Sequence, residues 1–119
     1  MYEYKCRLIR AVDGDTVECD VDLGFSIVLA RQKIRMAGID TPESRTRNLE
    51  EKKLGLKAKA RVKELIPKNF TMRTYKDAKG KFGRILGEPL TGDGKSVCDI
   101  LIKEGHARPY SGGKKETWV

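Results

Sequence analysis

The first third of the chain contains three closely spaced segments rich in Val, Ile, Leu and Thr, and this pattern constrains the fold more than any other feature. Residues 5–12, 16–21 and 26–36 each have the composition of a β-strand, and Gly14 and Gly24 fall between them. Short turns of this kind join antiparallel neighbours. The segment therefore predicts a three-stranded meander.

A different periodicity begins at residue 49. Between residues 49 and 66, apolar side chains recur at helical spacing, and lysines and arginines fill most of the other positions. The apolar positions are Leu54, Ala58, Val62 and either Leu65 or Ile66. Pro67 ends the predicted helix, and Gly55 indicates close packing or a bend. The basic face is interpreted as solvated, although it could also attract a phosphate backbone.

The remaining pattern completes a small barrel. Residues 70–75 and 84–87 read as two further strands around a turn at 77–81, and a short helix at 97–104 stops at Gly105. One helix thus lies between the third and fourth strands and another follows the fifth. This order predicts an α+β, mainly β fold: a five-stranded barrel of the oligonucleotide/oligosaccharide-binding (OB) kind with two or three helices.

Length and charge limit the organisation and the partners. A chain of 119 residues is the size of one domain, so we expect one barrel domain over 1–110 and a flexible polar tail over 111–119. Lys and Arg number 25 against 17 Asp and Glu, which gives a formal net charge of +8. Such a balance favours polyanionic partners, although a lysine-rich soluble surface has the same totals.

The cysteines and the start of the chain bear on location. Cys6, Cys19 and Cys98 are far apart and lack the paired spacing of zinc sites, so we interpret them as reduced thiols. The segment that begins at Met1 has neither a basic leader nor a long apolar run, which predicts a cytoplasmic protein with no membrane association. A secreted form trimmed of its leader would have the same sequence.

The motif Asp13-Gly-Asp-Thr-Val17 lies between the first two strands. Alternation along the second strand places Asp15 in the same inward phase as Val17. A carboxylate in that position needs a cation or hydrogen-bond donors. Read alone, the motif is also an ordinary hairpin turn, and Asp13 is assigned to the turn.

The motif Arg35-Met-Ala-Gly-Ile-Asp-Thr-Pro-Glu43 follows the third strand. Pro42 predicts an ordered turn that presents Asp40 and Glu43 in fixed directions. Read alone, Glu43 could be an acidic residue near the start of a helix. Together with the first motif and with Lys81-Phe-Gly-Arg84, the segment indicates a metal-dependent phosphodiesterase site.

These motifs and Leu101-Ile-Lys-Glu-Gly-His-Ala-Arg108 resemble, in order and approximate spacing, the staphylococcal nuclease (thermonuclease) family. The resemblance covers nearly the whole chain. It implies a five-stranded barrel with helices and a calcium-dependent nuclease that cuts DNA and RNA. By motif position, it implies that Asp15 and Asp40 supply carboxylates to Ca²⁺ and that the backbone carbonyl of Thr41 is a further ligand.

The same resemblance implies the other roles. Glu43 would position or deprotonate the attacking water, and Arg35 and Arg84 would hold the scissile phosphate. Lys81 and Tyr110 are expected to contact the substrate, although Tyr110 could instead close the barrel. A guanidinium suits a phosphate because it offers paired donors at fixed angles and stays charged at neutral pH.

The sequence therefore predicts a calcium-dependent nuclease that hydrolyses phosphodiester bonds of DNA and RNA by metal-assisted attack of water. Cleavage within the strand and a monomeric protein are expected. The leading alternative is a non-catalytic OB-like module that binds nucleic acid or protein, because barrels of this type also bind without cutting. A small interaction protein with an incidental basic surface would leave the acidic and arginine positions unexplained.

Overall fold

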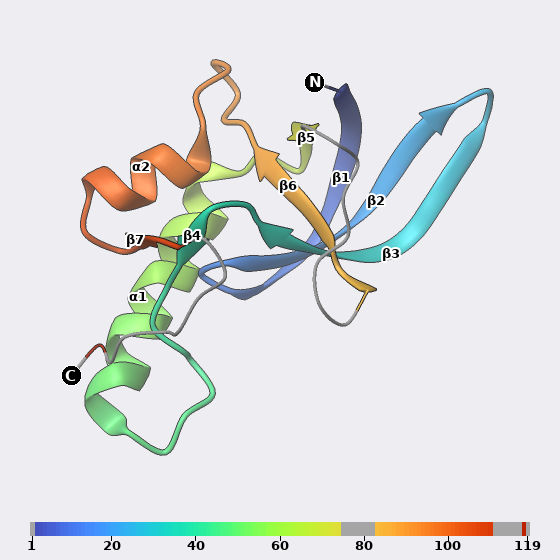
Figure 1. Ribbon diagram of the computed structural model, residues 1–119. Helices are drawn as coiled ribbons and strands as arrows, with labels where there is room; N and C mark the ends of the chain where they lie inside the picture. Colours follow the sequence, from blue (N-terminus) through green and yellow to red (C-terminus); the bar gives the residue numbers. More distant parts are fainter. Residues whose placement is uncertain (1, 75–82, 111–117, 119) are drawn as a thin grey trace.

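The computed structural model describes residues 2–74, 83–110 and 118. Five strands close into a barrel in the order β1-β2-β3-β6-β5, and helices α1 and α2 lie together on one side of it (Figure 1). The elements in chain order are β1 (Tyr2–Asp13), β2 (Thr16–Gly24), β3 (Ile27–Met36), β4 (Ile39–Asp40), α1 (Leu49–Leu65), β5 (Asn69–Thr74), β6 (Ile85–Pro89), α2 (Val97–Lys103) and β7 (Arg108–Pro109). The predicted α+β, OB-like barrel is confirmed.

The barrel closes where β3 and β6 run parallel. Ile34 lies opposite Ile85, and Met36 lies opposite Gly87, while the other neighbouring strands are antiparallel. A Cβ at position 87 would overlap the side chain of Met72. The glycine therefore permits the close approach that lets β6 complete the ring.

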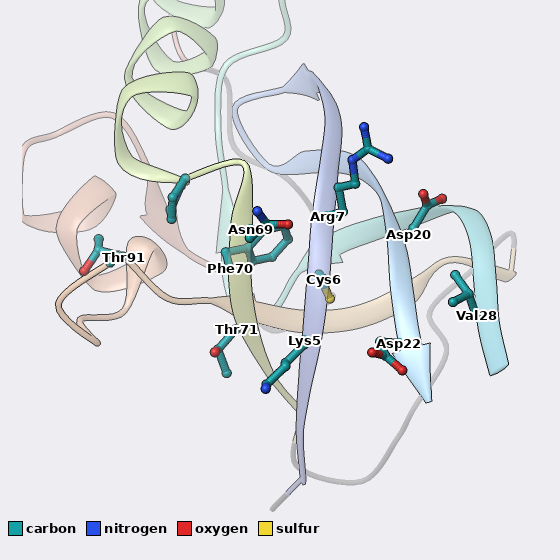
Figure 2. A pocket seen from close by; sticks show the side chains of 12 residues that line it. Lys5, Cys6, Arg7, Asp20, Asp22, Val28, Asn69, Phe70, Thr71 and Thr91 are labelled. Atoms are coloured by element: carbon teal, nitrogen blue, oxygen red, sulfur yellow. The ribbon is translucent and has the colours of Figure 1, made fainter. Parts of the chain in front are cut away.

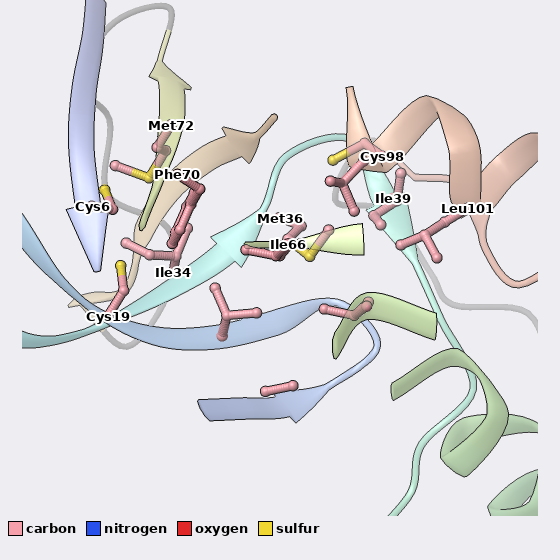
Figure 3. Close-up of a cluster of buried hydrophobic side chains, with 14 of the residues drawn as sticks. Cys6, Cys19, Ile34, Met36, Ile39, Ile66, Phe70, Met72, Cys98 and Leu101 are labelled. Atoms are coloured by element: carbon pink, nitrogen blue, oxygen red, sulfur yellow. The ribbon is translucent and has the colours of Figure 1, made fainter. Parts of the chain in front are cut away.

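The core fills the barrel with side chains from alternate positions of its strands (Figure 3). Val17, Cys19 and Val21 of β2 are all buried, as the alternation predicted. The largest fully buried side chains include Ile34, Met36, Ile39, Met72 and Leu101. Since these come from β3, β4, β5 and α2, one continuous core joins the barrel to the second helix.

The three cysteines are free thiols inside this core. Burial raises the pKa of the Cys98 thiol to about 12, and the nearby Glu88 and Asp99 act in the same direction. A hydrogen bond with Cys19 raises the pKa of Cys6, and burial adds to it. Since the thiolate is the reactive form, the raised pKa values make the thiols of Cys6 and Cys98 poor nucleophiles.

Helix α1 differs from its prediction in the residues it buries. Leu54 is 38% exposed, whereas Gly55, Ala58 and Val62 are buried. The predicted inward position of Leu54 is therefore wrong. Gly55 faces inward because a glycine, which has no side chain, leaves room for the backbone of the loop at Glu43. A leucine at this position would displace that backbone.

Most element bounds agree with the sequence prediction to within one or two residues. The second helix ends at Lys103, and Gly105 follows it with a φ of 82°, as a helix stop requires. Strand β6 begins at Ile85, so Arg84 precedes the strand instead of lying in it. The predicted turn at 77–81 lies outside the described residues.

Two contacts hold the helices in place. The side chain of Asn48 caps α1 by accepting hydrogen bonds from the N–H groups of Glu50 and Glu51 at 3.1 and 3.2 Å. Arg61 of α1 donates two hydrogen bonds of 2.7 and 2.8 Å to Glu104, which caps α2 and whose pKa is lowered by this pair. Within the described ranges, each helix is too short or too polar to cross a membrane.

A two-stranded sheet that the sequence did not predict lies beside the barrel. Ile39 and Asp40 of β4 pair antiparallel with Pro109 and Arg108 of β7. Tyr110 extends the pairing, since its N–H donates to the carbonyl of Gly38 at 2.8 Å. The segment at 108–110 is therefore attached to the strand that carries Asp40.

Candidate active site

Two carboxylates predicted to meet do lie beside the same arginine. Asp15 lies in the turn between β1 and β2, Arg35 lies in β3, and Asp40 lies in β4. Nη2 of Arg35 is 3.6 Å from Oδ2 of Asp15 and 3.9 Å from Oδ1 of Asp40. The three residues are 9%, 8% and 6% exposed, so the charges interact where water screens them little.

The guanidinium of Arg35 is fixed in orientation by backbone oxygens. Its Nη1 donates to the carbonyl of Met36 at 3.0 Å and to the carbonyl of Asp15 at 3.4 Å. Its other terminal nitrogen therefore faces both carboxylates. A lysine has one compact ammonium group and cannot reproduce this division between two carbonyls and two carboxylates.

Asp15 is oriented by neighbours on both of its oxygens. The N–H of Thr41 donates to Oδ2 at 3.2 Å, and the hydroxyl of Thr16 donates to Oδ1 at 3.1 Å. The first of these bonds joins the turn after β1 to the residue that follows β4, 26 positions along the chain. Thr41 is thereby placed next to the carboxylates with which it was predicted to share a metal.

Two glycines let this site pack tightly against α1. A Cβ on Gly14 would lie 2.7 Å from Cβ of Ala58 and 2.9 Å from Oγ1 of Thr41. A Cβ on Gly55 would lie 2.5 Å from the carbonyl carbon of Glu43. The helix therefore supports the backbone of the proposed catalytic glutamate directly.

We expect Gly55→Ala to reduce activity although alanine favours the helix by about 1 kcal/mol. The added methyl group must displace the Glu43 peptide, and a shift of about 1 Å at a catalytic group can cost roughly 100-fold in rate. Steady-state cleavage of labelled DNA and thermal unfolding would be measured together. Gly92→Ala is the matched control, because a Cβ there meets nothing within 4 Å. Normal cleavage by Gly55→Ala would show that this contact does not position Glu43.

Of the other predicted site residues, the structure describes Glu43, Arg84 and Tyr110. Glu43 is exposed, and its N–H donates to Oε2 of Glu51 at 2.9 Å. Arg84 is partly buried and directly precedes β6, in which Leu86 lies opposite Arg35. The ring centre of Tyr110 is 6.0 Å from Cζ of Arg35. Lys81, the remaining predicted substrate contact, lies outside the described residues.

The donor set suits a hard cation with open coordination positions. Among the described residues, no group of three or more His, Cys, Asp or Glu side chains could hold a metal ion. Asp15 and Asp40 offer carboxylate oxygens, which Ca²⁺ and Mg²⁺ prefer. With one backbone carbonyl, they would fill about half of the six to eight positions that Ca²⁺ takes, which leaves room for water and substrate.

A separate pocket of about 650 Å³ lies along β1, β2 and β5 (Figure 2). Lys5 and Arg7 line it together with Asp20 and Asp22, so its charges are mixed. None of the predicted site residues lines this pocket. The candidate active site therefore lies outside this pocket.

Sequence reasoning missed two residues that contact the site. The N–H and the hydroxyl of Ser44 both donate to Oδ1 of Asp13, which ties the loop after Glu43 to the first turn. Nε1 of Trp118 donates to Oδ2 of Asp40 at 3.2 Å. Neither contact has a local sequence signal, because the partners are 31 and 78 positions apart.

Comparison with known proteins decides the family. The profile described as "Staphylococcal nuclease homologue" matches residues 33–117, which is most of the chain and includes Arg35, Asp40, Glu43 and Arg84. The chain belongs to the staphylococcal nuclease family. The resemblance deduced from the motifs is thereby confirmed.

Several relatives of this staphylococcal nuclease family member carry nuclease names. Endonuclease YhcR of Bacillus subtilis (strain 168) is 33% identical over 115 residues, which are 91% of this chain and 9% of that protein. The SPbeta prophage-derived endonuclease YokF of the same organism is 37% identical over 103 residues, 85% of this chain and 32% of that protein. Thermonuclease of Staphylococcus hyicus is 32% identical over 107 residues, 89% and 59% respectively. The chain spans less than two thirds of each of these three relatives.

Proposed function

We propose that this member of the staphylococcal nuclease family is a calcium-dependent nuclease that hydrolyses phosphodiester bonds of DNA and RNA within the strand. The observation that carries the proposal is the convergence of Asp15 and Asp40 on Arg35. The nuclease names of the relatives and the net charge of +8 support it.

The arginines would bind the scissile phosphate. Charge grows on the non-bridging oxygens of a phosphodiester as water attacks, and guanidinium groups neutralise that charge with paired donors. One terminal nitrogen of Arg35 is held by two backbone carbonyls, so its orientation precedes substrate binding. Arg84 would approach from the position directly before β6, the strand that pairs with the strand of Arg35.

Glu43 would orient or deprotonate the attacking water. It is exposed beside buried Asp40 and Thr41, where both water and a phosphate could reach it. Its backbone is held by Glu51 and by the contact with Gly55. A carboxylate on a fixed backbone suits this role, because proton transfer requires hydrogen-bond contact with the water in a defined direction.

Asp15, Asp40 and the carbonyl of Thr41 would hold the cation. When bound, Ca²⁺ would supply positive charge that polarises the phosphate and lowers the cost of deprotonating water. Tyr110 and Lys81 would contact the substrate outside the reacting phosphate. The monomeric state and the cytoplasmic location stay predictions from the sequence.

The test is digestion of labelled linear and circular single-stranded DNA, and of RNA, with Ca²⁺ or with a calcium chelator. We expect all three substrates to be cut with Ca²⁺ and none with the chelator. Circular DNA has no ends, so its cleavage establishes cutting within the strand. Cleavage that persists in chelator and in Asp40→Asn would contradict the proposed site. Binding of the same substrates without cleavage would instead favour the non-catalytic binding module.

A further inference from the structure

Trp118 contacts one of the two carboxylates from the far end of the chain. Its indole Nε1–H donates to Oδ2 of Asp40 at 3.2 Å, across 78 sequence positions. The side chain is half-buried, and Cζ of Arg108 lies 3.9 Å from the centre of its ring. The indole is therefore held by a cation on its face and a carboxylate at its edge.

The backbone brings these two contacts together. Arg108 lies opposite Asp40 in the β4–β7 pair, so the residue that stacks on the indole is attached to the strand that carries the carboxylate. Oδ2 of Asp40 accepts from Trp118, while Oδ1 is the oxygen 3.9 Å from Arg35. Each oxygen of Asp40 thus has a neighbour that restricts rotation of the carboxylate.

We propose that Trp118 is a positioning residue for Asp40, and that its indole N–H orients this carboxylate for binding of the divalent cation. The inference rests on the proposed function, since it concerns the same cation site. An indole nitrogen can only donate, so it takes up one acceptor direction of Oδ2 and leaves the others to a cation. Hydrogen-bond donors to metal-binding carboxylates raise metal affinity by holding the ligand in place, and their removal typically costs about 10- to 100-fold.

The first experiment needs no metal, because Trp118 is the only tryptophan in the sequence. Intrinsic fluorescence therefore reports on this one side chain. We expect Asp40→Asn to shift the emission of the metal-free protein, because the charged acceptor at the indole edge is lost. Asp93→Asn is the matched control: Asp93 is exposed and forms a hydrogen bond with Thr91, so the emission should stay unchanged. Identical emission from wild type and Asp40→Asn would overturn the proposal.

The second experiment measures Ca²⁺ affinity by titration calorimetry. Trp118→Phe keeps an aromatic ring for Arg108 but has no N–H, and we expect it to bind Ca²⁺ about tenfold more weakly than wild type. Thr91→Val removes a side-chain donor to a different aspartate, Asp93, and should leave the affinity unchanged. Thermal unfolding of each variant would identify any loss of folded protein.

The outcomes separate this inference from the proposed function. Wild-type affinity in Trp118→Phe would overturn the role of Trp118 and leave the nuclease proposal standing. Failure of the wild-type protein to bind Ca²⁺ would overturn both. Weaker binding in Trp118→Phe with unchanged unfolding would support the positioning role, because a residue that serves stability alone would not alter affinity in a folded protein.

Discussion

Arg35→Lys is expected to reduce cleavage of single-stranded DNA by about 100- to 1,000-fold, the scale of losing one donor that stabilises the transition state. The structure gives the reason. One terminal nitrogen of Arg35 donates to the carbonyls of Met36 and Asp15, and the other faces Asp15 and Asp40. A lysine ammonium would keep the charge but lose the fork, so Arg35→Lys should be nearly as damaging as Arg35→Ala.

The measurement is kcat/KM at saturating Ca²⁺, together with urea unfolding to confirm the folded state. Arg73→Lys is the matched control. Arg73 also lies within 4 Å of two carboxylates, those of Glu3 and Glu88, but it belongs to β5 and is not among the predicted site residues. Near-normal cleavage by Arg35→Lys would mean that charge alone suffices and that the fixed guanidinium is not required.

Glu43→Gln is expected to lower kcat by about 100- to 10,000-fold, the range in which a positioned general base contributes. Glutamine has nearly the same shape and can still accept a hydrogen bond from water, but it cannot take up its proton. Since Glu43 is exposed and is held through its backbone, the substitution should not disturb the fold. Calcium affinity should change much less than in Asp40→Asn.

Glu50→Gln provides the comparison, because Glu50 is an exposed acidic residue in the first turn of α1. It should cleave at the wild-type rate. If Glu43→Gln also retained most of its kcat, Glu43 would not be the base, and the water would have to be activated by another group. A loss confined to KM would instead assign Glu43 to substrate binding.

Much of the fold could be predicted because it depends on local patterns. Alternating apolar residues in 16–21 marked the inward face of β2, and the change to helical spacing after residue 49 marked α1. The exception was Leu54, whose hydrophobicity suggested a core position. The neighbouring Gly55 is buried instead, because the backbone at Glu43 packs so close to the helix that any side chain at position 55 would overlap it.

The part of the candidate site that belongs to short sequence motifs could be predicted. Asp15, Arg35 and Asp40 stood out because their residue types match phosphate and cation chemistry, and the structure brings these three together. The contacts of Ser44 and Trp118 could not be predicted, because no periodicity or motif relates residues so far apart.

The sequence by itself determined the order of the five barrel strands and the two helices, the inward phase of Asp15 and the family to which the chain belongs. Only the tertiary structure decided that α1 supports the Glu43 backbone at Gly55, that β7 pairs with the strand of Asp40, and that Trp118 reaches its carboxylate. The physical reason is that periodicity and turn chemistry act over a few residues, whereas barrel closure and packing decide which distant residues meet.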